Sequence, residues 1–196
     1  MKIIGLTGSI GMGKTTTANM FKDLGCPVFD ADKAVHELYS KGSKGAALIQ
    51  AVFPDAIKDG AVNRARLGVH MKTDPLNLKV LESFIHPWVG EIRAKFLSGA
   101  KSNGAKAVVF DVPLLFETGG DKHVDATVVV SAPALTQKAR VLARPGVTPD
   151  IFEMLLSRQM SDADKRARAD YIISTGQGLE KAREQVQAVL TKILAS

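Results

Sequence analysis

The chain has 196 residues, of which 45% are hydrophobic and 23% charged, a composition typical of a globular protein with one sizeable core. Its one cysteine, Cys26, excludes an intramolecular disulfide, so a reducing cytoplasmic location is expected. No apolar run approaches the ~18 residues that a membrane span needs. The net charge of +6 suits anionic partners but does not distinguish nucleic acid from small phosphorylated ligands.

A phosphate-binding motif lies near the N-terminus. Residues 8–15 read GSIGMGKT and match G-x-x-x-x-G-K-[ST], between a predicted strand at 3–6 and a predicted helix at 15–24. Glycines let the backbone wrap an anion, and the helix N-terminus adds N–H donors and a positive dipole end. Lys14 is expected to reach the β and γ phosphates, and the Thr15 hydroxyl to ligate Mg²⁺. We therefore expect a nucleoside triphosphate with magnesium as the ligand.

Two aspartates follow the second predicted strand, at residues 28–30. Carboxylates at the carboxyl end of a strand beside the phosphate loop lie on the ligand-binding edge of an open parallel sheet. One aspartate can cap the predicted helix at 31–39, and we assign that role to Asp30. Asp32 is then expected to orient an acceptor hydroxyl and take its proton, as a kinase base does.

Residues 42–104 contain no predicted strand of the core sheet. Apolar residues recur at helical spacing over 46–53, 64–73 and 76–98, which predicts a helical insertion of the kind that builds an acceptor pocket in kinases. Pro87 is expected to kink or restart the last of these helices. His86 fits a packing role as well as a ligand contact, whereas Trp88 is expected in the core.

The apolar run at 107–110 predicts a central strand buried on both faces. It ends at Asp111, where a carboxylate can hold the magnesium shell. Glu117 is either a surface carboxylate or an acceptor contact, and the sequence leaves these alternatives even. Further strands are predicted at 125–130 and 169–173, and an amphipathic final helix at 179–193.

Arginines recur on the next predicted helix, at 133–143. Gln137, Arg140 and Arg144 are spaced by three and four residues and share one face. A Pro/Gly turn separates this helix from another that begins at 151. Two such helices suit a lid that closes over phosphates, but an ordinary hairpin with exposed arginines has the same pattern, so both alternatives stay open.

Taken together, these stretches resemble the dephospho-coenzyme A kinase family over nearly the whole chain. The phosphate loop is common to many families, but the combination of Asp-Ala-Asp, His-Pro and Pro-Leu-Leu-Phe-Glu is much more specific. The residues that carry the resemblance are 5–15, 29–32, His86-Pro87, 111–117, Gln137 with Arg140, Gln159-Met160-Ser161, Lys165 and Ala169-Asp170.

The resemblance implies an α/β fold of the P-loop NTPase type, similar to the nucleoside monophosphate kinases, with a five-stranded parallel sheet flanked by helices. The nucleotide-binding core would comprise residues 1–33, 105–137 and 167–196. A helical acceptor-binding insertion would span 34–104 and a lid 138–166. The implied reaction is ATP-dependent phosphorylation of the 3′-hydroxyl of the dephospho-coenzyme A ribose.

The resemblance also implies roles for individual residues. The catalytic residues would be Lys14, Asp32 and Arg140. Mg²⁺ would contact Thr15 and Asp111. The acceptor would contact Asp32, Arg64, His86, Leu114 and Glu117. ATP would contact Gly11, Met12, Gly13, Lys14, Thr15, Thr16, Arg144 and Thr175.

Two positions depart from the family pattern. Arg144-Pro145-Gly146 stands where relatives often have Arg-Asp-Gly. Around Thr175, an asparagine that is common in relatives after the last strand is replaced. Because that side chain is missing, backbone contacts are expected to bind the adenine instead. We expect a small-molecule acceptor, with no nucleic acid or membrane partner, and a monomer or weak homo-oligomer.

Other function classes fit the sequence less well. The nearest alternative is a kinase for another small hydroxyl or nucleotide acceptor, because fold alone does not set the substrate. A GTP-dependent switch would need N-K-x-D and D-x-x-G segments, which the sequence lacks. A nucleic-acid-binding module would cluster aromatics on a basic face, yet aromatics are 6% of the residues and are scattered.

Overall fold

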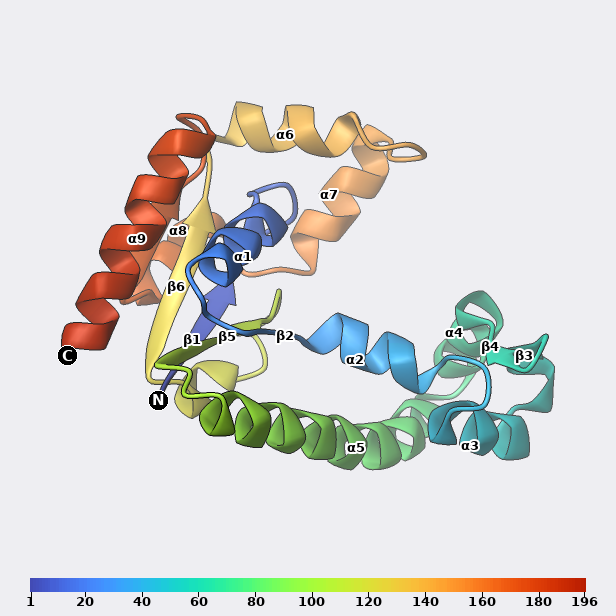
Figure 1. Cartoon of the computed structure of the whole chain (residues 1–196). Coiled ribbons are helices and arrows are strands. Elements are labelled where there is room, and N and C mark those ends of the chain that lie inside the picture. The colour runs from blue at the N-terminus through green and yellow to red at the C-terminus, as the bar shows by residue number, and fades with distance from the viewer. The chain divides into compact units, whose positions relative to one another are not determined.

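The computed structural model describes residues 1–196, with the exception of the Pro75 side chain. The chain forms two compact units, one of residues 1–29 and 99–196 and the other of residues 30–98 (Figure 1). Within the described part of the chain, no helix is both long and apolar enough to cross a bilayer.

The first unit is built on the predicted five-stranded parallel sheet, with strand order β2-β5-β1-β6-β7. Every residue of β5 and of β6 is buried; for β5 the continuous apolar run at 107–110 predicted this. All five predicted strands are confirmed. Their bounds are β1 (Lys2–Thr7), β2 (Val28–Asp30), β5 (Ala107–Asp111), β6 (Ala126–Ser131) and β7 (Tyr171–Ser174).

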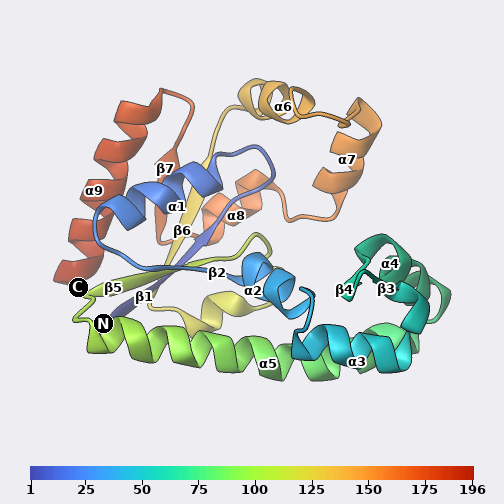
Figure 2. The ribbon, with the colours of Figure 1, turned by 45° about the vertical axis from the view of Figure 1, so that its right-hand side comes forward.

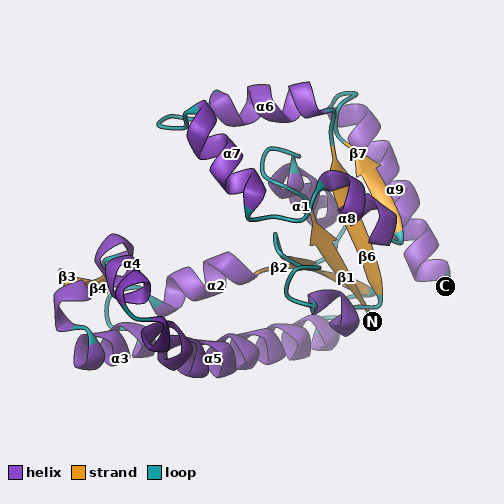
Figure 3. Cartoon of the chain, turned by 180° about the vertical axis from the view of Figure 1, so that it is seen from behind, coloured by secondary structure: helices purple, strands orange, loops and turns teal.

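Helices cover both faces of this sheet. In Figure 1 α1 lies in front of the strands and α8 behind them, and in the opposite view of Figure 3 α8 lies in front. Helices α1 and α9 pack against each other, and their apolar residues Phe21, Val186 and Ile193 join Ile4 and Val128 in the core. The helices of this unit are α1 (Lys14–Asp23), α6 (Ala134–Leu142), α7 (Pro149–Ser157), α8 (Asp162–Arg168) and α9 (Leu179–Ala195).

The second unit is mainly helical, as the spacing of apolar residues predicted, and Figure 2 shows its helices. It has its own core of seven buried residues. The partly buried Trp88 packs against this core, which confirms its predicted place. The helices are α2 (Ala31–Leu38), α3 (Lys44–Val52), α4 (Arg64–Thr73) and α5 (Pro75–Ser102), whose last residues belong to the first unit. The core residues are Leu38, Ile49, Phe53, Ala56, Leu67, Leu81 and Ile85.

One local prediction needs correction, and two elements were not predicted. Of the kink or restart expected at Pro87, the restart does not occur: α5 runs through the proline as a single helix, and the neighbouring Ile85 and Trp88 pack in or against the core of the second unit. A hairpin of β3 (Ile57–Lys58) and β4 (Ala61–Val62) was missed, although its Asp-Gly turn is a strong hairpin signal. Helix α8 was missed too, although Ser161 caps it in a Ser-x-x-Asp pattern.

Candidate active site

The phosphate loop joins β1 to α1 and can be formed only with glycines at several positions. Gly11 and Gly13 have φ values of 78° and 95°, in the left-handed region that favours glycine. A Cβ added to Gly11 would lie 2.5 Å from Val141 Cγ2, and one added to Gly8 would lie 2.6 Å from the Val130 carbonyl oxygen. The loop therefore keeps its backbone close to β6 and α6, with the first N–H groups of α1 at its end.

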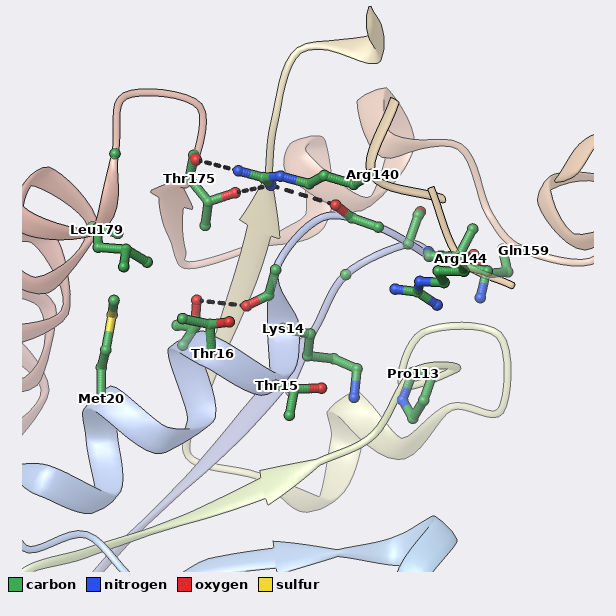
Figure 4. A pocket seen from close by; sticks show the side chains of 18 residues that line it. Lys14, Thr15, Thr16, Met20, Pro113, Arg140, Arg144, Gln159, Thr175 and Leu179 are labelled. Carbon is green, nitrogen blue, oxygen red and sulfur yellow. Dashed lines mark hydrogen bonds between the residues drawn. The ribbon is translucent and has the colours of Figure 1, made fainter. Parts of the chain in front are cut away.

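A pocket of about 590 Å³ opens beside this loop (Figure 4). It brings together eight of the residues that we predicted to bind the nucleotide or act in catalysis. Met12 and Asp32 are the exceptions. Met12 is 2% exposed, and its sulfur accepts a hydrogen bond from the Ala132 amide, so its side chain belongs to the core. Asp32 lies on α2 in the second unit and does not line this pocket. The predicted residues that line the pocket are Gly11, Gly13, Lys14, Thr15, Thr16, Arg140, Arg144 and Thr175.

Lys14 and Asp111 meet at this pocket. Their side chains form an ion pair between Lys14 Nζ and Asp111 Oδ1, and they are 17% and 8% exposed. Lys14 begins α1, and Asp111 ends β5, which pairs with β1. The parallel sheet thus places the predicted phosphate ligand and the predicted metal ligand within direct contact, while the Thr15 side chain is exposed one residue further along.

Two glutamines hold Ile10 at the tip of the loop. Gln137 Nε2 donates to the Ile10 carbonyl at 2.8 Å, and the Ile10 amide donates to Gln159 Oε1 at 3.0 Å. Gln137 lies on α6 and Gln159 follows α7, so helix α6 and the segment after α7 are both hydrogen-bonded to the same loop residue. The sequence alone did not predict that these glutamines hold the phosphate loop. The pattern that could have indicated it is a glutamine at each end of a hairpin that carries arginines.

Arg140 is bound to two segments of the pocket wall. Its Nη1 donates to Thr175 Oγ1 at 3.0 Å and to the Gly11 carbonyl at 3.4 Å, and its Nη2 donates to the Thr175 carbonyl at 2.8 Å. The Thr175 hydroxyl in turn donates to the Met12 carbonyl at 2.6 Å. Arg140 is exposed to solvent, but these bonds tether its guanidinium to the pocket wall, and Arg144 lines the same pocket with an exposed side chain.

Glu117 forms an ion pair with the buried Lys165. Lys165 is fully buried, and its Nζ lies 2.9 Å from Glu117 Oε1 and donates to the Pro113 carbonyl at 3.0 Å. Glu117 Oε1 also accepts from the Met160 amide at 2.8 Å. Burial alone raises the pKa of Glu117, but the Lys165 and Met160 hydrogen bonds and the Lys165 charge lower it below the ordinary 4.5. These contacts fix the loop after Asp111, on which Leu114 is exposed.

In the second unit, Asp32 and Arg64 line one groove of about 450 Å³. Asp30 Oδ1 accepts from the Lys33 amide at 2.9 Å, which confirms Asp30 as the cap of α2 and leaves Asp32 exposed in the first turn. The Arg64 guanidinium lies over the Tyr39 ring at 5.6 Å. Burial raises the pKa of Tyr39, and the Arg64 charge opposes this.

His86 lies exposed on α5, which does not suit the packing alternative, and the groove lining does not include it.

The residues present fit a magnesium ion that is shared with a triphosphate. Among the described residues, no group of three or more His, Cys, Asp and Glu side chains could hold a metal alone. Magnesium at nucleotide sites usually takes one or two protein oxygens, with phosphates and water completing its octahedron. The Thr15 hydroxyl and the Asp111 carboxylate beside the loop supply such a donor set.

Comparison with known proteins shows the family. The family model described as "Dephospho-CoA kinase" matches residues 2–181. A dephospho-CoA kinase from Mesorhizobium japonicum is 50% identical over 193 residues, covering 98% of this chain and 97% of that protein.

Among solved structures, TT1252 from Thermus thermophilus has a TM-score of 0.85 and 32% identity, covering 97% of each chain. The dephospho-CoA kinase from Campylobacter jejuni has a TM-score of 0.69 and 25% identity, covering 98% of this chain and 97% of that one. The family match, the near-complete coverage and the fold lead to one conclusion: this chain belongs to the dephospho-CoA kinase family.

Proposed function

We propose that this chain transfers the γ-phosphoryl group of ATP to the 3′-hydroxyl of the dephospho-coenzyme A ribose, giving coenzyme A and ADP. The observation that carries the proposal is the pocket beside residues 8–15, in which Lys14, Arg140 and Arg144 converge on a glycine loop at a helix N-terminus. Family membership supports the choice of acceptor. We place the reaction in the cytoplasm and expect a monomer or weak homo-oligomer.

The nucleotide site would act mainly through position and charge. Backbone N–H groups from Gly11 to Thr16 would hold the ATP phosphates, because the loop and the first turn of α1 present them together. Lys14 and Arg140 would neutralise charge that develops on the transferred group. Thr15 and Asp111 would hold Mg²⁺, which supplies further positive charge when bound. Lys14 would then exchange its contact with Asp111 for the phosphates.

The acceptor site would use residues of the second unit. Asp32 would orient the ribose hydroxyl and accept its proton, and Arg64, in the same groove, would bind the anionic acceptor. His86, Leu114 and Glu117 remain proposed acceptor contacts. For Glu117, the contacts with Lys165 and Met160 also support an indirect role, through the shape of its loop.

One assay tests this proposal directly. ADP release is measured with ATP and Mg²⁺ and with dephospho-coenzyme A, AMP, adenosine or shikimate as the acceptor, and the product is identified by mass and by its 3′-phosphate. We expect dephospho-coenzyme A to be strongly preferred. Equal use of another acceptor would instead favour a kinase of different specificity on the same fold.

Variants of Asp32 test the proposed base. Asp32→Asn should lower kcat by about 100-fold or more, the typical contribution of a general base, while ATP binding changes little. Glu37→Gln is the matched control, because Glu37 is an exposed carboxylate on the same helix. An unchanged kcat in Asp32→Asn would exclude the assignment.

A further inference from the structure

Thr175 connects three parts of the nucleotide site in the first unit. It follows β7, and its amide donates to the Ser131 carbonyl at 2.9 Å. Its hydroxyl donates to Met12 in the phosphate loop, and both its hydroxyl and its carbonyl accept from Arg140 on α6. Thr175 itself is only 8% exposed, whereas Arg140 is exposed.

The chemistry of these contacts requires a hydroxyl. One oxygen must accept an N–H from the guanidinium and donate its own hydrogen to the Met12 carbonyl, 2.6 Å away. Gly13 lies beside this side chain, since a Cβ added to Gly13 would lie 3.2 Å from Thr175 Oγ1 and 3.3 Å from Thr175 Cγ2. The side chain thus packs against Gly13, the residue before α1, while it bridges Arg140 to the loop.

Arg140 is held on one side only. Within the described part of the chain, its contacts with Thr175 and Gly11 use three of the five N–H donors of the guanidinium. Its remaining donors are available at the pocket that Arg140 lines. A long arginine side chain has many rotamers, so a donor aimed in advance at developing charge is more effective than one that must be ordered during the reaction.

We propose that Thr175 is a positioning residue, which fixes the Arg140 guanidinium against the phosphate loop in the orientation used for phosphoryl transfer. This inference rests on the proposed kinase function, in which Arg140 neutralises developing charge. It also assigns Thr175 a role different from the adenine contact that its place after the last strand suggested. The Thr175 amide donates to Ser131 and its hydroxyl donates to Met12, so an adenine contact through either donor would have to break an existing hydrogen bond.

The test compares variants that change only the hydroxyl. Thr175→Val keeps the shape but removes the bridge, and Thr175→Ser keeps the bridge. We expect Thr175→Val to lower kcat by about tenfold or more, the size expected for a hydrogen bond to a charged group, with the KM for ATP within about twofold of wild type. Thr175→Ser should restore kcat to within about twofold. In the Arg140→Ala background, Thr175→Val should have little further effect, because its action passes through Arg140.

Thr127→Val is the matched control. Thr127 is also a buried threonine, but its hydroxyl bonds to Asp170 rather than to a residue of the pocket. It should change thermal stability without a selective loss of kcat. If Thr175→Val does not fold, Thr175→Cys, which keeps the volume and weakens the hydrogen bond, is assayed in its place.

Three outcomes would overturn the inference. The first is an unchanged kcat in Thr175→Val. The second is a Thr175→Val enzyme that keeps its kcat but has a raised KM for ATP or no longer prefers ATP over GTP. The third is a loss of kcat from Thr175→Val that adds to the loss from Arg140→Ala in the double variant. A readout without turnover separates this inference from the proposed function. In wild type, NMR of ¹⁵N-labelled arginine should show restricted rotation of the Arg140 Nη groups, lost in Thr175→Val and kept in Thr127→Val. A wild-type protein that shows this restriction but does not phosphorylate dephospho-coenzyme A would contradict the function alone.

Discussion

The ion pair between the buried Lys165 and Glu117 predicts a large and specific loss of stability. In Lys165→Met an apolar side chain of similar length takes the place of the lysine methylene groups, and the ammonium group that contacts Glu117 and the Pro113 carbonyl is lost. Removing one partner of a buried ion pair typically costs about 3–5 kcal/mol. We expect no more than the lower end, about 3 kcal/mol, because the Glu117 side chain is 20% exposed and keeps the Met160 amide, and the Pro113 carbonyl keeps the Thr7 hydroxyl.

That loss can be measured by thermal unfolding. For a chain of this size, each kcal/mol lowers Tm by roughly 2–4 °C, so Lys165→Met should unfold up to roughly 6–12 °C below wild type. Lys181→Met is the matched control: its side chain is 62% exposed, and exposed ion pairs contribute only about 0–1 kcal/mol.

The double variant Lys165→Met with Glu117→Gln should recover part of the loss, because no unpaired charge then remains. A Tm for Lys165→Met within about 2 °C of wild type would refute the reasoning.

Three further predictions concern Lys14, Gly11 and Glu117. Lys14→Ala should lower kcat, measured by ADP release, by about 1000-fold, while circular dichroism shows that the fold is retained. Lys22→Ala, which removes an exposed lysine from the same helix, should leave kcat unchanged. Gly11→Ala should weaken ATP binding and stability by at least ~1–2 kcal/mol, since φ is 78° and its Cβ would meet Val141, and normal calorimetric affinity would contradict the strain argument. The lowered pKa of Glu117 contributes stability that is fully present above pH 4.5 and is lost as pH falls through the folded pKa, so the difference in unfolding free energy between wild type and Glu117→Gln should narrow as the pH is lowered below 4.5.

The secondary structure and much of the nucleotide site could be predicted because their signals are local. The five strands are short apolar runs, and the buried ones have no polar alternation. Asp30 could be identified as a cap from its position before a helix, and Lys14 from its place in a loop that only closely spaced glycines can form. At Pro87, packing of the neighbouring residues outweighed the tendency of proline to interrupt a helix. At Asp59-Gly60, the turn residues formed a hairpin within a stretch whose apolar spacing indicated helices.

By itself, the sequence determined that a strand, a glycine loop and a helix would form a phosphate site, because each step depends on residues adjacent in the chain. Only the tertiary structure decided which distant groups meet there. Thr175 contacts Met12 across 163 positions of the chain, and Lys165 contacts Glu117 across 48. Such pairings depend on strand order and on burial, which leaves each hydroxyl, carboxylate or ammonium with few possible partners once water is excluded.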